Sequence, residues 1–261
     1  WIEAPLRSAV LAKQRHDAID ELTTIFSDIQ SILQNLSDLE RVSARLALRT
    51  IKPQELLASA ESLSYLPVLL DHLKNTAATQ ALCPLIPQPD WVHQVQSTLV
   101  SDPPAHWKDG GIIREGVDET LDELRQLASH HDEALTQIEH TEQTRTQLSS
   151  LRVAHNRIHG YFIEVSKGQA AQVPAHYRKK QILKNVERFT TDELTAWEQK
   201  ITQADAEALA REKQLYETLV SDLLARSDTL KANALSLATL DVLCNFSERA
   251  QSLQLSRPEF Q

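Results

Sequence analysis

The sequence predicts a mainly α-helical protein in which two long helices flank a small β-rich insertion. Only five glycines occur among the 261 residues, and none follows Gly168, which favours long helices over a sheet-rich fold. Apolar residues recur at helical spacing on both sides of a central segment, residues 151–191, where the period changes to that of a strand. The simplest arrangement is an antiparallel pair of helices with the insertion at its tip.

Residues 1–115 are predicted to form part of a helical core. Leu39, Val42, Leu46 and Arg49 are spaced so that they lie on one helical face. Prolines and glycines then accumulate between residues 84 and 111, so loops and short helices are expected there.

Residues 116–150 are predicted to form one long outgoing helix of about 50 Å, at a rise of about 1.5 Å per residue. From Val117 onward, positions alternately four and three residues apart are apolar at first and polar later, at Glu142 and Arg145. This pattern is typical of an amphipathic helix whose far end leaves the core.

Residues 151–191 are predicted to form the β-rich insertion. Residues 161–166 alternate at strand spacing, and Arg152–Asn156 is a plausible partner strand. After Pro174, basic residues recur every three to four positions, so a helical turn there would place them on one face.

Residues 192–261 are predicted to form the returning helix and further core helices. Thr190 and Glu193 fit a capping box, in which Thr190 caps the helix and Glu193 reaches back to it. Neither glycine nor proline occurs between Leu194 and Ala225, and the helical pattern continues to Arg249.

The insertion is also a basic island in an acidic chain. Residues 151–191 carry eight Lys or Arg against two Glu, a net charge of +6, whereas the whole chain is −9 and the remainder therefore −15. Such an island indicates a polyanionic ligand, most often nucleic acid. The alternative is a solvated basic surface without a ligand.

The sequence contains no recognisable motif of an enzyme active site. It contains neither a phosphate-binding G-x-x-x-x-G-K-[ST] loop nor a G-x-S-x-G elbow. His155 and His159 would lie up to about 13 Å apart on a continuous strand, which disfavours a shared metal ion. Cys83 and Cys244 lie in apolar surroundings and are expected to be reduced, buried thiols of a cytoplasmic protein. No stretch is long and apolar enough to span a membrane.

Several segments, in order along the chain, resemble the MutS family of bacterial DNA mismatch-repair proteins. Residues 152–168 (RVAHNRIHGYFIEVSKG) and 177–189 (YRKKQILKNVERF) resemble the clamp of that family. Residues 38–50 resemble its core, and residues 211–216 and 240–250 its returning lever helix. The resemblance therefore implies a middle fragment with core, lever and clamp domains.

In that family the whole protein is an ATP-driven homodimer that encloses double-stranded DNA and acts with a MutL-type partner. ATP and Mg belong to a C-terminal ATPase domain, and a Phe-x-Glu motif in an N-terminal domain reads the mismatch. This sequence has neither site, and it contains no Met, so it is expected to be a piece of a longer protein that is not itself an enzyme and holds no cofactor.

Carried over position by position, the resemblance places Asn156 and Asn185 among the residues that touch the DNA backbone, with Lys184 beside Asn185. Further expected DNA-binding residues are Arg157, Lys167, Arg178 and Lys180. The function expected is sequence-independent clamping of duplex DNA, coupled by the levers to an ATPase elsewhere. The rival is a helical scaffold whose basic tip binds an acidic partner protein.

Overall fold

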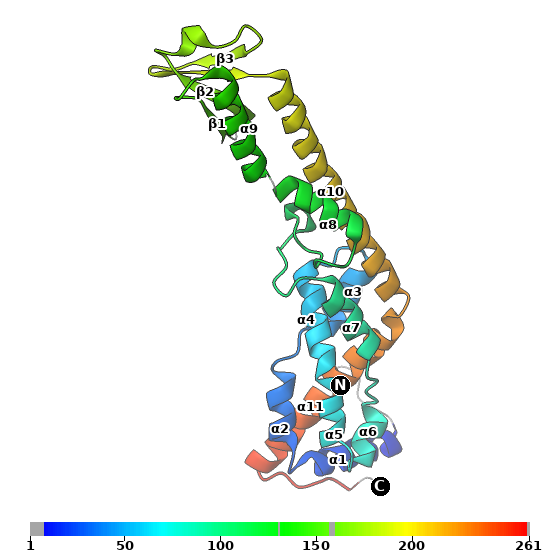
Figure 1. The fold of residues 1–261 in the computed structure, drawn as a ribbon. Helices are drawn as coiled ribbons and strands as arrows, with labels where there is room; N and C mark the ends of the chain where they lie inside the picture. The colour runs from blue at the N-terminus through cyan, green and yellow to red at the C-terminus, as the bar shows by residue number, and fades with distance from the viewer. Residues whose placement is uncertain (1–7, 130, 157–159, 260–261) are drawn as a thin grey trace. The chain divides into compact units, whose positions relative to one another are not determined.

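The structure, a computed structural model, describes residues 8–129, 131–156 and 160–259. The chain divides into two compact units. Unit 1 contains the described residues up to Val117 and those from Lys213 onward, and unit 2 runs from Asp118 to Glu212. The described residues are mainly helical with one small antiparallel sheet, which confirms the predicted fold class (Figure 1).

Unit 1 is built from helices only, apart from an isolated bridge between Leu99 and Ile113. Its elements are α1 (Ala9–Leu22), α2 (Phe26–Leu33), α3 (Leu39–Ala47), α4 (Pro53–Ser64), α5 (Leu66–His72), α6 (Ala77–Leu82), α7 (Pro89–Thr98), the 3₁₀ turn η1 (Trp107–Asp109), the end of α10 (Asp192–Leu224) and α11 (Ser227–Ser252). Helix α11 packs against α1, α2 and α3, and α4 packs against α7.

The predicted face of α3 is confirmed for its three apolar residues, whereas Arg49 lies beyond the end of the helix at Ala47. Leu39, Val42 and Leu46 are all buried in the core of unit 1. The helix begins at Leu39 because the Asp38 carboxylate accepts a hydrogen bond from the Arg41 backbone N–H at 2.9 Å, which satisfies a donor of the first turn.

Cys83 and Cys244 are buried free thiols, as predicted. Burial raises the pKa of each thiol to about 12, so neither is a thiolate at neutral pH. Among the described residues, none of the helices combines the length and the apolar character that crossing a membrane requires.

Unit 2 consists of a four-stranded antiparallel sheet and the helices that precede and follow it. Its elements are α8 (Glu119–Ser129), α9 (His131–Thr146), β1 (Arg152–Asn156), β2 (Gly160–Ser166), the 3₁₀ turn η2 (Ala170–Gln172), β3 (Arg178–Ile182), β4 (Val186–Thr190) and the beginning of α10. The strand order is β1-β2-β4-β3. The two strands predicted from the alternation are thus confirmed as β1 and β2.

Two ion pairs join α8 and the preceding residue to α10 within unit 2. Arg211 contacts Asp118 at 2.6 Å, and Arg125 contacts Glu212 at 2.5 Å. Because the sheet follows α9 and precedes α10, the α8–α9 segment and the first part of α10 run antiparallel in this unit (Figure 1).

Three local predictions are wrong. The basic run after Pro174 forms strand β3 rather than a helical turn, because residues 178–182 pair along β4. The cap of α10 is Thr191, whose hydroxyl accepts the Leu194 N–H at 3.1 Å, and not Thr190. The outgoing segment, predicted as one helix over residues 116–150, contains the two helices α8 and α9, which begin at Glu119 and end at Thr146.

The far end of α9 lies in unit 2, outside the helical core of unit 1, as its polar seam predicts, but it packs against the sheet, which the seam did not predict. Leu135 and Ile138 of α9 pack against a buried cluster formed by the inner face of the sheet. The cluster consists of Leu148, Leu151, Tyr161, Ile163, Val165, Tyr177, Phe189 and Leu194. Glu142 at the end of the seam is only 4% exposed.

Candidate nucleic-acid interface

Both acidic residues of the basic island are already engaged by cations of the same island. Arg188 on β4 contacts Glu164 on β2 at 3.1 Å, and Lys179 on β3 contacts Glu187 on β4 at 2.7 Å. The first pair follows from the strand register, which places Glu164 opposite Arg188, whereas Lys179 lies opposite Phe189 and reaches Glu187 diagonally. Two of the eight cations of residues 151–191 are therefore part of the sheet's internal structure.

Arg188 is the most firmly held cation of the outer face of the sheet, the face opposite the buried cluster. Its guanidinium lies 4.1 Å from the centroid of the Phe162 ring and donates to the Gln181 side chain at 3.0 Å. Its side chain is 18% exposed. Stacking and ion pairing together orient this group along the sheet rather than toward solvent.

Three predicted site residues meet at one end of the sheet. Lys167 follows β2, and its backbone N–H donates to the Asn185 carbonyl at 3.0 Å. Lys184 lies beside Asn185 in the turn between β3 and β4. All three side chains are exposed. We refer to Lys167, Lys184 and Asn185 as the basic turn.

The other predicted site residues that are described lie toward the opposite end. Asn156 pairs with Gly160, the first residue of β2. Arg178 contacts Asp192 of α10 at 2.8 Å, and Lys180 donates to the Tyr161 carbonyl at 3.2 Å. The length of β2 separates this end from the basic turn by about 20 Å at 3.3 Å per residue.

The structure therefore does not bring the predicted DNA-binding residues together into one cluster. It separates the exposed lysines of the basic turn from cations that already contact other protein atoms. Arg157, also predicted to bind DNA, and His159 lie outside the described residues.

Arg152 is a cation that the predicted set of DNA-binding residues omitted. It is exposed at the start of β1 and lies opposite Glu164, toward the same end of the sheet as the basic turn. The signal was available in the sequence, because a residue that begins one strand of an antiparallel pair lies near the end of the other strand.

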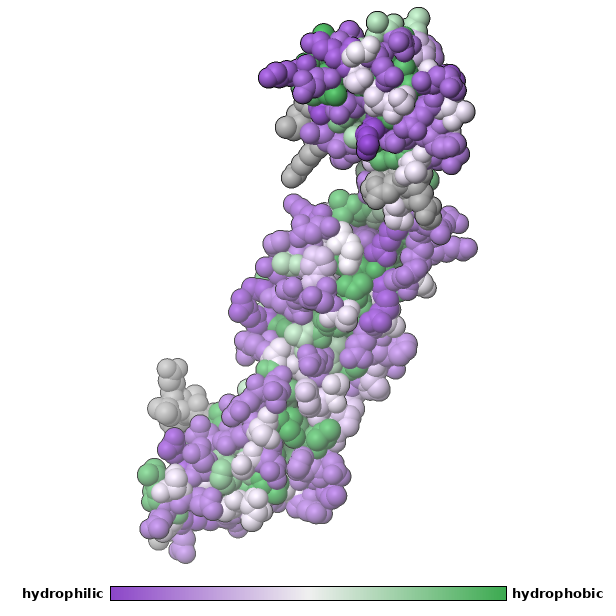
Figure 2. All heavy atoms as spheres, turned by 60° about the vertical axis from the view of Figure 1, so that its left-hand side comes forward, coloured by the Kyte–Doolittle hydropathy of each residue, from purple (hydrophilic) through white to green (hydrophobic). Residues whose placement is uncertain are grey.

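The chemistry of this end of the sheet suits phosphate groups. Ammonium, guanidinium and amide groups donate hydrogen bonds to phosphate oxygens and set position, but in such contacts they do not read bases. Figure 2 shows that the visible surface of the sheet region, in the upper part of the view, is mostly hydrophilic. Within the described residues, no group of His, Cys, Asp and Glu is arranged to hold a metal ion.

The opposite end of the sheet is fastened to α10. The Glu198 carboxylate accepts the Tyr161 backbone N–H at 3.2 Å, and Trp197 meets the Tyr161 ring edge-on with centroids 4.9 Å apart. Gly160 has a φ of +65°, and a Cβ at this position would overlap the Glu198 carboxylate. Glycine is thus favoured where β2 begins.

A comparison with protein families matches residues 1–247 to the family model of MutS domain III. The match covers nearly the whole chain, including the sheet and the helices on either side of it.

Proposed function

Since the chain belongs to the MutS family of DNA mismatch-repair proteins, we propose that its sheet clamps duplex DNA through the phosphate backbone without reading sequence. The observation that carries this proposal is the basic turn. Lys167 and Lys184 are exposed at one end of the sheet, and Arg152 lies toward the same end. Phosphates are the ligands that such a group of cations favours.

The charge of the rest of the chain confines this contact to the sheet. The net charge of −15 outside residues 151–191 opposes approach of DNA to other faces, whereas the island is attractive at +6. Non-specific affinity at physiological salt is then expected in the usual range of about 10⁻⁴ to 10⁻⁶ M.

The two helical arms of unit 2 are proposed to act as levers. Segment α8–α9 leads into the sheet and α10 leads out of it, and the ion pairs of Asp118 and Glu212 hold the arms together. In this proposal the levers couple the clamp to an ATPase domain outside the chain, where ATP and Mg bind. The homodimer and the MutL-type partner likewise belong to the longer protein, in the cytoplasm.

Binding of a fluorescent random-sequence duplex, measured by anisotropy against salt concentration, tests the clamp. Each lost phosphate contact reduces the slope of log K against log salt by about 0.9. Lys184→Ala is therefore expected to reduce the slope by about one unit and to weaken binding equally for all sequences. Asn185→Ala is expected to weaken binding without changing the slope, because the amide releases no counterion.

Lys108→Ala is the matched control, because Lys108 is an exposed lysine of unit 1, 5.8 Å from the Trp107 ring. The proposal is wrong if Lys108→Ala weakens binding as much as Lys184→Ala. A polyacidic peptide that binds at this turn more tightly than duplex DNA would instead favour a protein-docking role.

A further inference from the structure

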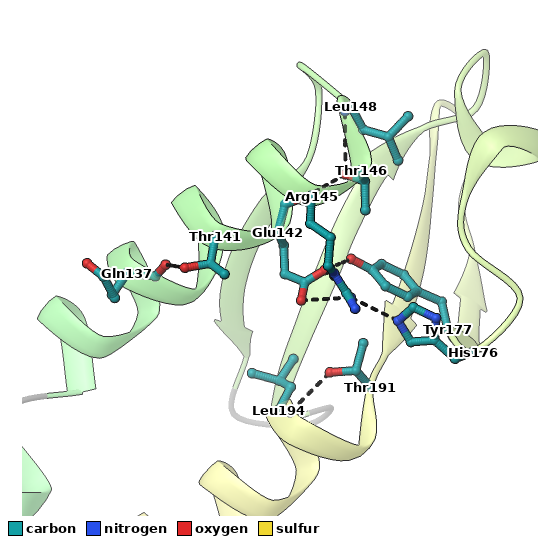
Figure 3. Close-up of polar contacts among 10 residues, drawn as sticks. All are labelled: Gln137, Thr141, Glu142, Arg145, Thr146, Leu148, His176, Tyr177, Thr191 and Leu194. Carbon is teal, nitrogen blue, oxygen red and sulfur yellow. Dashed lines mark hydrogen bonds and ion pairs between the residues drawn. The ribbon is translucent and has the colours of Figure 1, made fainter.

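The polar end of α9 forms a partly buried network with the segment that leads into β3, in which Glu142 and Tyr177 are buried and Arg145 and His176 are exposed. The Glu142 carboxylate accepts a hydrogen bond from the Tyr177 hydroxyl, and the Arg145 guanidinium contacts both carboxylate oxygens, at 2.6 and 2.9 Å (Figure 3). The same Arg145 nitrogen lies 2.8 Å from Nε2 of His176.

The buried polar groups of this network need hydrogen-bond partners within the protein. Glu142 is 4% and Tyr177 7% exposed, so a carboxylate here requires hydrogen-bond partners in place of water. Glu142 also raises the pKa of Arg145, and burial with the neighbouring Glu142 raises the pKa of Tyr177. Both partners of Glu142 thus keep their protons at neutral pH, and both donate to its side chain.

A second glutamate of α9 contacts the opposite edge of the sheet, at strand β1. Glu139 accepts the Val153 backbone N–H of β1 at 2.9 Å. Gln143, on the same stretch of α9, donates to the Leu151 carbonyl just before β1 at 2.7 Å. Since β1 and β3 are the two edge strands, α9 holds one edge through Glu139 and the start of the other through Glu142.

We propose that Glu139 and Glu142 are positioning residues that fix the sheet on α9 at both edges, so that DNA binding at the basic turn is transmitted to this helix. The inference rests on the proposed function, because it assigns the path from the DNA-binding sheet into one of its levers. Apolar packing of the sheet on α9 is non-directional. Hydrogen bonds of defined geometry at two separate points restrict rocking of the sheet.

The test uses the whole 261-residue chain with the double substitution Glu142→Gln and Tyr177→Phe. Both changes nearly preserve volume and leave the aromatic ring in the buried cluster, but they remove the charge and the hydroxyl that make the contact. The control carries Glu207→Gln and Tyr65→Phe, the same chemical changes at an exposed site of α10 and a half-exposed site in unit 1.

The first measurement needs no DNA. Spin labels on cysteines at His140 of α9 and Ile182 of β3, both exposed, report the distance between helix and sheet. The buried native thiols, Cys83 and Cys244, are protected from the label. The distance distribution is expected to broaden in the Glu142→Gln/Tyr177→Phe variant and to stay unchanged in the control.

The second measurement is hydrogen exchange of α9 with and without a short duplex. In the unsubstituted chain and in the control, duplex binding is expected to slow exchange of α9 amides. In the Glu142→Gln/Tyr177→Phe variant, duplex affinity and salt slope are expected to stay as they are, because the basic turn is intact. The DNA-induced protection of α9 is expected to be lost.

The two proposals fail in different ways. An unchanged distance distribution, or α9 protection that still responds to DNA in the variant, overturns the positioning role. A network that only stabilises the fold would speed α9 exchange equally with and without DNA, and this outcome also overturns it. Absence of duplex binding by the unsubstituted chain overturns the clamp function, while the distance measurement still decides whether the Glu142–Tyr177 contact fixes the sheet on α9.

Discussion

Gly160→Ala tests how the sheet is fastened to α10. Gly160 has a φ of +65°, a conformation that alanine adopts at a cost of about 1–2 kcal/mol. The added Cβ would also displace the Glu198 carboxylate, which accepts the Tyr161 N–H at 3.2 Å. Leaving that N–H without its partner costs a further 1–3 kcal/mol or so. Local opening of the β1–β2 hairpin should therefore become easier by roughly 2–5 kcal/mol.

Native-state hydrogen exchange of β2 peptides measures this local free energy. Gly116→Ala is the matched control, because Gly116 has a φ of +83° and a Cβ there would meet nothing within 4 Å. Gly116→Ala should show only the free-energy cost of alanine at a positive φ, measured in the peptides around residue 116. In a Glu198→Ala background the clash is absent, so Gly160→Ala should then cost no more than Gly116→Ala. Equal costs of the two glycine substitutions in the unsubstituted chain would refute the role given to Glu198.

Two further predictions concern the helices of unit 2. Thr191→Ala should destabilise the start of α10 by about 1 kcal/mol, and Thr190→Ala should destabilise it by clearly less. Hydrogen exchange of the first helical turns measures both effects, and the reverse order would mean that Thr190 is the cap. Arg125→Ala should destabilise unit 2 by about 3 kcal/mol, the lower end for a broken buried pair, because it removes an ion-pair partner of the buried Glu212. Adding Glu212→Gln should recover part of that loss in urea denaturation, and no recovery would contradict the charge argument.

Much of the architecture was predictable because it depends on local periodicity. The change from helical to alternating spacing located β1 and β2, and the absence of glycine and proline between Leu194 and Ala225 located α10. The periodicity of the sequence did not predict β3, because its consecutive cations are equally compatible with a helix and with an extended strand. Strand β3 exists because β4 offers it a hydrogen-bonding edge, which is a tertiary condition.

The polar seam of α9 shows a second limit of sequence reasoning. The polar residues Glu142 and Arg145 predict a helix end that leaves the core, since charged residues are rarely buried without partners, and this pattern does not indicate that Glu142 is buried against the sheet. The partner that buries Glu142 is Tyr177, 35 positions further along the chain. No helical or strand period relates two residues at that separation, so only the fold could show that these side chains hold the sheet.

A count of charges in the sequence has the same limit, because it does not show which cations are already paired in the fold. This changes the expected salt dependence of DNA binding. Counted from the sequence, the net +6 of residues 151–191 predicts about six phosphate contacts and a salt slope near −5. In the structure, Arg188 and Lys179 pair with the acids of the sheet, Arg178 pairs with Asp192, and Lys180 binds a backbone carbonyl. Of the described cations, this leaves Arg152, Lys167 and Lys184 exposed toward one end of the sheet, which predicts a slope near −3. A measured slope near −5 would mean that DNA breaks the internal ion pairs of the sheet to reach their cations.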